Sequence, residues 1–126
     1  FHFNLDCATS VAQRGKIEAY ERAGKKLPDG WVVGNDGKTM TDPSTVLKAL
    51  VAGTAALTPL GGLGEETAGY KGYGYAVAVE VLSAALSNAK FMKDLNGLDE
   101  SGNKIPYPLG HFFIAIDIKS FIDPAI

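Results

Sequence analysis

Residues 1–24, FHFNLDCATSVAQRGKIEAYERAG, begin with the alternation of a β-strand and continue with the spacing of a helix. Phe1, Phe3 and Leu5 alternate with polar residues, which is the period of a strand that turns one face to a core. The alternation ends at Asp6, so the strand is expected over residues 1–6. The stretch therefore predicts a strand, a tight turn and a helix in direct succession.

The helix after the turn has a predicted start, a charged face and a stop. Ser10 can cap it, and Gln13 stands three residues later, at the spacing of a capping box. Three charged residues lie four positions apart on one face and can pair along it: Arg14, Glu18 and Arg22. Gly24 supplies the stop, because glycine readily adopts the left-handed backbone that ends helices.

Turns dominate the predicted structure of the next segment. Residues 34–37 (GNDG) and 41–43 (TDP) have the composition of turns, so a loop with short turns is expected there. A brief helix capped by Ser44 is predicted over residues 44–50. A short apolar run then covers residues 55–60.

The second half of the chain alternates between loop, helix and strand patterns. Residues 61–69 form a glycine-dense loop, which needs a reason to be ordered, and a bound ligand is one such reason. Residues 73–89 have a helical pattern that is apolar nearly all round, so this helix is expected to be buried on most of its surface. Residues 94–108 form a polar connection, and residues 111–117 predict a strand covered on both faces. This alternation favours a layered α/β fold.

Composition favours one folded domain. The chain has 126 residues, 46% of them hydrophobic, which is enough for a single modest core. The net charge of −2 is spread along the sequence, so neither nucleic acid nor an anionic membrane is an expected partner. The apolar runs are too short for a membrane span, and no signal peptide is evident. With a lone cysteine, Cys7, a cytoplasmic location is expected. Because strand alternation is already under way at Phe1, the chain is expected to be a piece of a longer polypeptide.

Residues 69–74, GYKGYG, open the predicted apolar helix and form a first candidate site. A helix start attracts anions, glycines allow a phosphate to approach the backbone, and Lys71 adds a positive charge. The bland alternative is a plain loop before a helix. The segment is not a P-loop, because Gly72 follows the lysine. Nor is it the Rossmann fingerprint, because Val77 stands where the third glycine belongs.

Residues 6–10, DCATS, form the second candidate site, at a strand end that runs into a helix. Asp6, Thr9 and Ser10 can bond a ribose, an amide or a phosphate there. The alternative is that Thr9 and Ser10 only cap the helix. Cys7 has no neighbouring histidine, which favours packing over a nucleophilic role.

The remaining reactive residues favour structural roles. His2 and His111 each lie in a predicted strand without a second ligand at metal-binding spacing, so no metal site is predicted. Glu65 and Glu66 are adjacent on the glycine-dense loop and are expected to be solvated rather than to form an acid/base pair.

Three segments, residues 5–43, 57–86 and 110–117, together resemble the type-2 malate/L-lactate dehydrogenase family, which includes sulfolactate, ureidoglycolate and diketogulonate oxidoreductases. The resemblance rests on the order DxATS, RGKI, GW, TDP, PLGG and KGYG. It spans essentially the whole chain but only the middle portion of the family's longer sequence.

The resemblance implies a three-layer α/β/α fold around a mixed sheet, distinct from Rossmann, in an intertwined homodimer. Residues 1–126 would be a fragment of a single NAD(P)-binding domain. The implied reaction is reversible hydride transfer between NAD or NADP and a small 2-hydroxy or 2-keto acid such as malate or lactate.

The resemblance also assigns site residues. Those expected at the cofactor are Asp6, Cys7, Ala8, Thr9, Ser10, Tyr70 and Lys71. The family usually has methionine where this chain has Cys7, which preserves a backbone contact but not a side-chain contact. The family's catalytic histidine and its arginine partner match no residue here, so no catalytic residue is predicted and the chain alone is expected to be inactive. The alternative hypothesis is a non-enzymatic ligand-binding or self-association module that uses the apolar helix as its partner surface.

Overall fold

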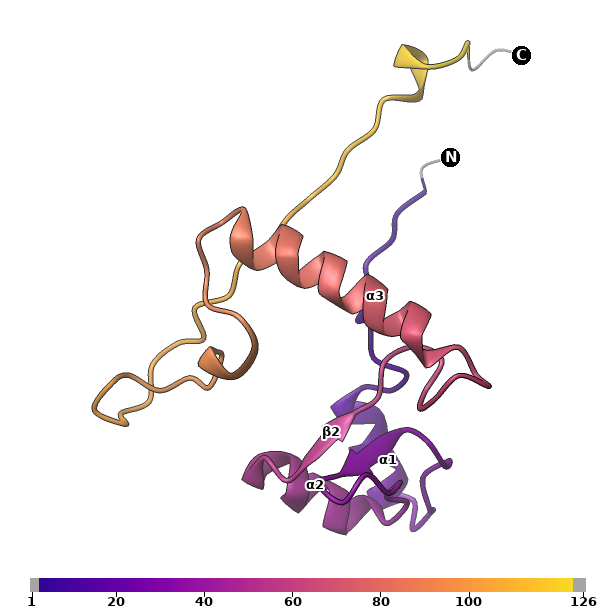
Figure 1. Cartoon of the computed structure of the whole chain (residues 1–126), viewed down its shortest axis with the longest axis vertical. Helices are drawn as coiled ribbons and strands as arrows, with labels where there is room; N and C mark the ends of the chain where they lie inside the picture. The colour runs from indigo at the N-terminus through magenta and orange to yellow at the C-terminus, as the bar shows by residue number, and fades with distance from the viewer. Residues whose placement is uncertain (1–2, 124–126) are drawn as a thin grey trace. The chain divides into compact units, whose positions relative to one another are not determined.

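The computed structural model describes residues 3–123, and the chain divides into two compact units, Phe1–Ala78 and Val79–Ile126. The elements of the first unit are α1 (Arg14–Arg22), β1 (Val32–Gly34), α2 (Pro43–Ala52), β2 (Ala55–Leu57) and most of α3 (Gly69–Glu80) (Figure 1). The second unit continues α3 as a π-helical turn and adds two short 3₁₀ turns: Val81–Ala85, Met92–Asp94 and Ile118–Ser120. The chain is therefore a small mixed α/β structure.

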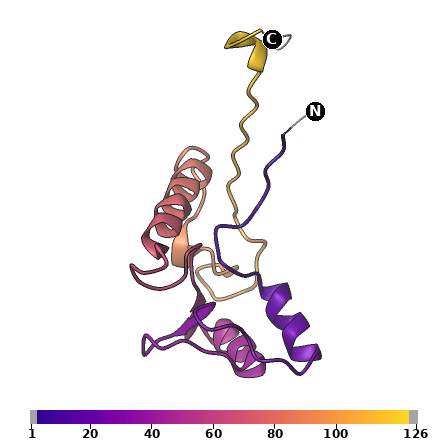
Figure 2. The same ribbon diagram turned by 90° about the vertical axis from the view of Figure 1, so that its right-hand side faces the viewer.

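The core of the first unit lies where α1 and α2 meet a two-stranded sheet (Figure 2). β1 pairs antiparallel with β2, and Val32 stands opposite Leu57. The fully buried side chains of this core come from α1, β1, α2 and the loop after α1: Ile17, Val32, Val46 and Leu27. Trp31 packs edge-on against Tyr20, with ring centroids 5.5 Å apart, and closes one side of the core.

Backbone hydrogen bonding continues beyond β2 and pairs residues 58–60 with residues 9–11, the segment before α1. Val11 donates its N–H to the carbonyl of Thr58 at 2.9 Å, and Leu60 donates to the carbonyl of Thr9 at 2.9 Å. Thr58 is buried, and its hydroxyl donates to the carbonyl of Gly30 at 2.6 Å, so its polar group is satisfied. Residues 9–11 are thereby held against the end of the sheet.

This pairing explains why the predicted start of α1 is wrong. The helix begins after Gln13, and Ser10 does not cap it, because Ser10 lies in the paired segment and its hydroxyl donates instead to the carbonyl two residues later at 2.8 Å. The stop at Gly24 is confirmed by its φ of +63°. The predicted pair of Arg14 and Glu18 is also present, with 3.1 Å between the charged groups.

Two predictions for the middle segment are corrected. β1, residues 32–34, was not predicted, and its last residue lies in a stretch expected to be loop, because pairing with residues 55–57 overrides the turn-rich composition that follows. α2 is longer than predicted and is capped by Asp42 rather than Ser44. A carboxylate oxygen of Asp42 accepts the N–H of Thr45 at 2.9 Å, and proline at the first helical position favours this start.

The two strands predicted near the ends of the chain are not formed among residues 3–123. Residues 3–6 and 111–117 have no regular structure, whereas residues 1–2 of the first prediction lie outside the described part. Phe3 is 83% exposed and Phe113 is 93% exposed, so the expected core positions face solvent. A strand needs a neighbour to bond its backbone, and the described part of the chain offers these segments none.

The predicted apolar helix exists but begins earlier, at Gly69, and is not buried as expected. Its exposed large apolar residues are Tyr70, Tyr73, Tyr75, Val77 and Val79, and only Gly69 and Gly72 are buried within α3. Exposed apolar side chains are thus spread along this helix within residues 3–123. In the same part of the chain no helix has both the length and the apolar character that crossing a membrane requires.

The buried position 46 is expected to matter more to stability than the exposed position 51 on the same helix. Val46 has no exposed area, so Val46→Ala removes two methyl groups from the core and is expected to cost about 2 kcal/mol. Val51 is 74% exposed, and Val51→Ala should change stability by less than about 0.5 kcal/mol. Urea unfolding of both variants tests the placement of the core, and equal losses would contradict it.

The cap of α2 predicts a dependence of stability on pH. The side-chain and backbone hydrogen bonds from Thr45 lower the pKa of Asp42 below its ordinary 3.8. Because the folded pKa is lowered, the stabilisation is present above the unfolded pKa and is lost as pH falls through the folded pKa. Asp42→Ala should therefore melt at a lower temperature than the parent near neutral pH, and the difference should shrink in strong acid.

The control for this measurement is Glu66→Ala. Glu66 is an exposed carboxylate whose side chain has no hydrogen-bond partner among residues 3–123. Its removal should leave the melting temperature unchanged at both pH values. A difference between parent and Asp42→Ala that persists undiminished in acid would show that the carboxylate is not the stabilising group.

Candidate functional site

Both segments predicted to contact the cofactor lie in the first unit, and Leu60 connects them. Its N–H donates to the carbonyl of Thr9 at 2.9 Å. On its other side it lies against Gly72 of α3. A Cβ placed on Gly72 would lie 2.6 Å from the carbonyl carbon of Leu60 and closer still to its oxygen. The strand-end segment and the start of α3 are therefore both fixed to the same residue.

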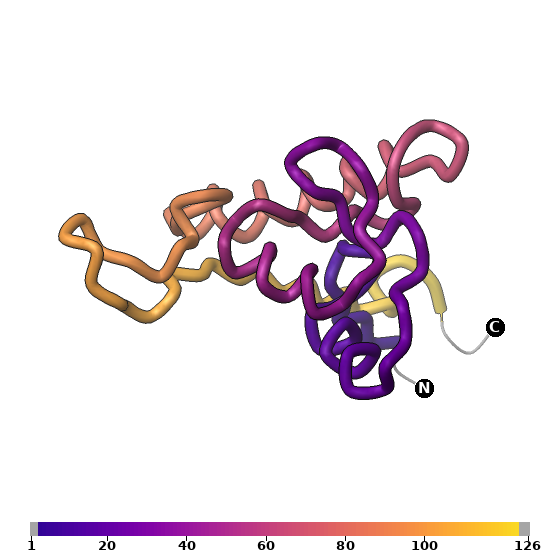
Figure 3. Tube along the Cα trace, turned by 90° about the horizontal axis from the view of Figure 1, so that it is seen from below, coloured from indigo at the N-terminus to yellow at the C-terminus, as the bar shows by residue number. Residues whose placement is uncertain are grey.

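The glycine-dense loop folds back on the beginning of α3 (Figure 3). A Cβ on Gly69 would lie 3.0 Å from the carbonyl carbon of Gly62, and one on Gly61 would lie 2.7 Å from the carbonyl oxygen of Thr67. Gly61 also has a φ of +91°, a backbone that other residues rarely adopt. Close packing of backbone on backbone thus explains these glycines without a ligand.

The GYKGYG segment forms the first turns of α3 rather than a loop before it. Two of the amides expected to face an anion are already bonded: Gly69 donates to the carbonyl of Gly64 at 3.2 Å, and Lys71 donates to that of Ala68 at 3.0 Å. The side chain of Lys71 is exposed, and its ammonium lies 6.0 Å from the ring centroid of Tyr70. The lysine cation, rather than a row of bare amides, is therefore the main attraction for an anion.

The strand-end residues differ in how exposed their side chains are and in which of their hydrogen-bonding groups are free for a ligand. Asp6, Cys7 and Ala8 are exposed, and the carboxylate of Asp6 has no hydrogen-bond partner among residues 3–123. Thr9 and Ser10 are half-buried, and the Ser10 hydroxyl already donates its proton within the turn. Asp6 and Thr9 are consequently the side chains of this segment that are most available to hydroxyl or amide groups of a ligand.

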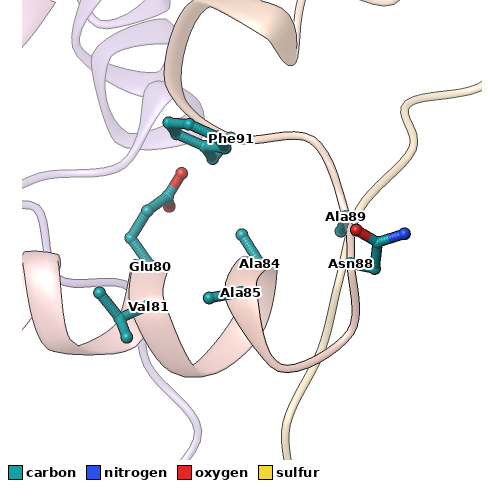
Figure 4. Close-up of a pocket in the computed structure, with 7 residues that line it drawn as sticks. All are labelled: Glu80, Val81, Ala84, Ala85, Asn88, Ala89 and Phe91. Atoms are coloured by element: carbon teal, nitrogen blue, oxygen red, sulfur yellow. The ribbon is translucent and has the colours of Figure 1, made fainter.

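A hollow of about 360 Å³ lies in the second unit (Figure 4). It is lined by Glu80, Val81, Ala84, Ala85, Asn88, Ala89 and Phe91. Figure 4 shows the Glu80 side chain beside Phe91, and one carboxylate oxygen of Glu80 accepts the N–H of Met92 at 2.9 Å. The walls are largely apolar, and none of the residues predicted at the cofactor lines this hollow.

The other reactive residues have structural surroundings. His111 stacks on Phe113 with ring centroids 6.4 Å apart, whereas His2 lies outside the described residues. Glu65 and Glu66 are exposed on the loop, as predicted. Across residues 3–123, no three His, Cys, Asp or Glu side chains gather where they could hold a metal.

A second acidic position away from the site is also explained by local structure. The Asp99 carboxylate accepts the backbone N–H of Ser101 at 2.9 Å and that of Asn103 at 2.8 Å. It also accepts a hydrogen bond from the side-chain amide of Asn103 at 3.1 Å. The bonds from Asn103 are the largest cause of its lowered pKa. This carboxylate therefore stabilises a turn.

The residues that position the site were not identified from sequence. Leu60 has no chemistry of its own, and Gly72 was noted only as a possible phosphate contact. Gly69 and Gly72 are three residues apart and therefore lie on the same face of α3. This spacing is the sequence signal that could have identified a helix face in close contact with another backbone.

Comparison with known proteins places these features in context. The whole chain, residues 1–126, matches the sequence model of the family described as malate/L-lactate dehydrogenase. A malate dehydrogenase of Pyrococcus horikoshii is 41% identical over 120 residues, which are 95% of this chain and 31% of that protein. A Delta(1)-pyrroline-2-carboxylate reductase of Ancylobacter novellus is 37% identical over 119 residues, 94% of this chain and 31% of that protein.

A solved structure is similar over nearly the same range. The crystal structure of malate dehydrogenase from Entamoeba histolytica superposes with a TM-score of 0.83 at 39% sequence identity, covering 94% of this chain and 32% of that one. The chain thus spans less than a third of the length of these relatives, at 31% and 32%.

The contact between α3 and Leu60 predicts opposite effects at two glycines of one helix. Gly72→Ala places a Cβ 2.6 Å from the Leu60 carbonyl carbon, and a backbone atom cannot move aside cheaply, so a loss of about 3 kcal/mol is expected. Gly74 has no atom within 4 Å of its Cβ position, so Gly74→Ala should stabilise by about 0.5–1 kcal/mol through helix propensity. Thermal unfolding compares the two, and equal effects would contradict the contact.

Proposed function

The chain belongs to the malate/L-lactate dehydrogenase family, and from this membership we propose that it provides part of the NAD(P) site of an oxidoreductase acting on a small 2-hydroxy or 2-keto acid. Two of its relatives are named for malate and for Delta(1)-pyrroline-2-carboxylate. Both compounds have a carboxylate next to the carbon that gains or loses a hydride. A malate-like or lactate-like substrate fits this chemistry.

The single observation that supports the cofactor site is the double contact of Leu60. It holds Thr9 by a hydrogen bond and Gly72 by close packing, so the end of the strand-end segment at Thr9 and the first turn of α3 belong to one assembly. We assign the dinucleotide contacts to the strand-end segment and the start of α3: Asp6, Cys7, Ala8, Thr9, Ser10, Tyr70 and Lys71.

The groups available in this assembly fit a dinucleotide. Lys71 presents an exposed ammonium, which suits a phosphate. Asp6 presents a carboxylate that can accept hydrogen bonds from ribose hydroxyls, and Tyr70, 61% exposed, presents a ring face that can stack on a base. These groups can recognise the charge, the hydroxyls and a ring of such a ligand.

When bound, the nicotinamide would exchange a hydride with the substrate carbon that bears the hydroxyl or keto oxygen. The chain's own part is binding and orientation. Lys71 would hold the phosphates, and the packing of Gly72 on Leu60 would keep the backbone of the first turn of α3 at a constant distance from Thr9, which lowers the entropy cost of reaching the reactive geometry. We assign proton transfer and recognition of the substrate carboxylate to the part of the polypeptide that this chain does not span.

We further propose that residues 1–126 belong to a single NAD(P)-binding domain with a three-layer α/β/α arrangement around a mixed sheet. α3 is apolar on all sides, which supports an arrangement in which other elements pack on more than one side of this helix. The enzyme is proposed to be a cytoplasmic homodimer, and the free, exposed thiol of Cys7 is consistent with a reducing compartment.

Loss of the Lys71 charge should weaken cofactor binding. Lys71→Met keeps a long apolar side chain but removes the ammonium, and loss of one charge-assisted hydrogen bond costs about 1.5–3 kcal/mol, or roughly 10- to 150-fold in Kd. Isothermal titration calorimetry with NADH and NADPH measures this change. The protein used should have the full length of its relatives.

Lys16→Met is the matched control, because the ammonium of Lys16 also lies 6.0 Å from a tyrosine ring, that of Tyr20, on a helix of the same unit. It should bind both dinucleotides with the affinity of the parent. Equal affinities of parent and Lys71→Met, with both variants folded, would remove Lys71 from the cofactor site.

A further inference from the structure

The GW motif, Gly30 and Trp31, has no part in the cofactor contacts proposed for this chain, yet it is held firmly. Gly30 has a φ of +79°, a backbone that suits glycine. Trp31 packs edge-on against Tyr20 beside the core. The carbonyl groups of both residues of the motif accept hydrogen bonds from one residue, Thr58, which follows β2. The motif is therefore joined to the segment that supports the candidate site.

Thr58 links this turn to residues 9–11. Its side chain is 1% exposed and is the one buried polar side chain among residues 3–123. Its N–H donates to the Trp31 carbonyl at 3.1 Å, and its hydroxyl donates to the Gly30 carbonyl at 2.6 Å. The carbonyl of Thr58 accepts the N–H of Val11 at 2.9 Å. Thr58 is thus bonded both to the turn and to the residues before α1.

The hydroxyl of Thr58 makes a bond that its backbone does not. Backbone bonds would form with almost any residue at position 58, whereas donation to the Gly30 carbonyl needs a small side chain with a hydroxyl. Among residues 3–123 this carbonyl has no other donor. The hydroxyl also lies 3.3 Å from the Trp31 carbonyl, which already accepts a backbone N–H. Removing the hydroxyl would leave the Gly30 carbonyl without a protein donor and loosen the turn from position 58.

The turn supports both parts of the candidate site through residues 58–62. Residues 58–60 fix residues 9–11, because Leu60 donates to the Thr9 carbonyl at 2.9 Å in addition to the bond at Thr58. A Cβ on Gly62 would lie 3.7 Å from the Gly30 carbonyl oxygen, so the glycine-dense loop that leads to α3 lies against the same turn. A displaced turn would therefore shift the supports of the strand-end segment and of the loop before α3.

We propose that Thr58 is a positioning residue of the dinucleotide site. Its buried hydroxyl holds the Gly30–Trp31 turn to residues 58–60, and these residues set where Thr9 stands relative to the cofactor. Thr58 touches no ligand itself, and the GW motif contributes through this hydrogen bond rather than by contact with the dinucleotide. The inference rests on the proposed function, because it assigns a support to the cofactor contacts at residues 6–10.

Two substitutions at position 58 test the hydroxyl in the protein at the full length of its relatives. Thr58→Val keeps the shape of the side chain and removes the donor, whereas Thr58→Ser keeps the donor. Thr58→Val is expected to raise the Kd for the dinucleotide roughly 5- to 30-fold, and Thr58→Ser should stay within about 2-fold of the parent. Calorimetric titration with NADH and NADPH at a temperature where each variant is folded measures the Kd.

Thr45→Val is the matched control for a general loss of stability. The Thr45 hydroxyl donates to the Asp42 carboxylate at 2.5 Å, at the start of α2 and away from residues 9–11. Thr45→Val should lower the melting temperature and leave the Kd for the dinucleotide at the value of the parent. A weaker affinity in Thr58→Val alone would then reflect position rather than stability.

The outcomes separate this proposal from the proposed function. An unchanged Kd in Thr58→Val, together with weakened binding in Lys71→Met, would overturn the role of Thr58 and leave the cofactor site in place. Unchanged affinity in both variants would overturn both proposals. Equal weakening in Thr58→Ser and Thr58→Val would assign the effect to packing of the methyl group and also overturn the role of the hydroxyl.

Thr58→Cys replaces Thr58→Val if the valine variant does not fold, because a thiol is similar in size to a hydroxyl and is only a weak donor. Its Kd is expected to lie above that of Thr58→Ser. Equal affinities of the cysteine and serine variants would overturn the proposal.

Discussion

The arrangement of the first unit depends on Leu60, because its backbone is used on two sides at once. Its N–H completes the pairing that holds residues 9–11 to the end of the sheet, and its carbonyl fills the space that a side chain at Gly72 would need. A backbone group cannot change rotamer, so this contact has little freedom. It gives Thr9 of the strand-end segment and the first turn of α3, which contains Lys71, a common support.

Local chemistry predicted part of this fold well. Gly24 ends α1, Arg14 and Glu18 pair along it, and the glycine-dense loop stays a loop. These features depend on residues a few positions apart. The helix starts were less well predicted: Ser10 is diverted by pairing with residues almost 50 positions away, and Asp42 rather than Ser44 caps α2. β1 was missed for the same reason, because its strand character comes from its partner rather than from its own turn-rich neighbours.

In the candidate site, too, local sequence patterns were predictable and long-range contacts were not. The two segments were identified from motifs and family resemblance, but the residue that joins them has no distinctive chemistry and could not have been chosen from sequence. The strand patterns at residues 3–6 and 111–117 describe side chains suited to a sheet, whereas pairing requires a neighbour that the described part of the chain does not contain. A pattern of apolar residues thus predicts what a segment needs, not whether a given stretch of polypeptide supplies it.

The π-helical turn at Val81–Ala85 has a consequence for how this helix can change over evolution. A π turn amounts to one extra residue in a helix, and each extra residue rotates all later side chains by about 100° about the axis. In an amphipathic helix such a slip would carry polar groups into the interior. Around α3 and its continuation nearly every direction is apolar, so the slip exchanges one hydrocarbon surface for another. The main cost of a single-residue insertion or deletion there would be the close packing of Gly110 on Ser83 and Ala89.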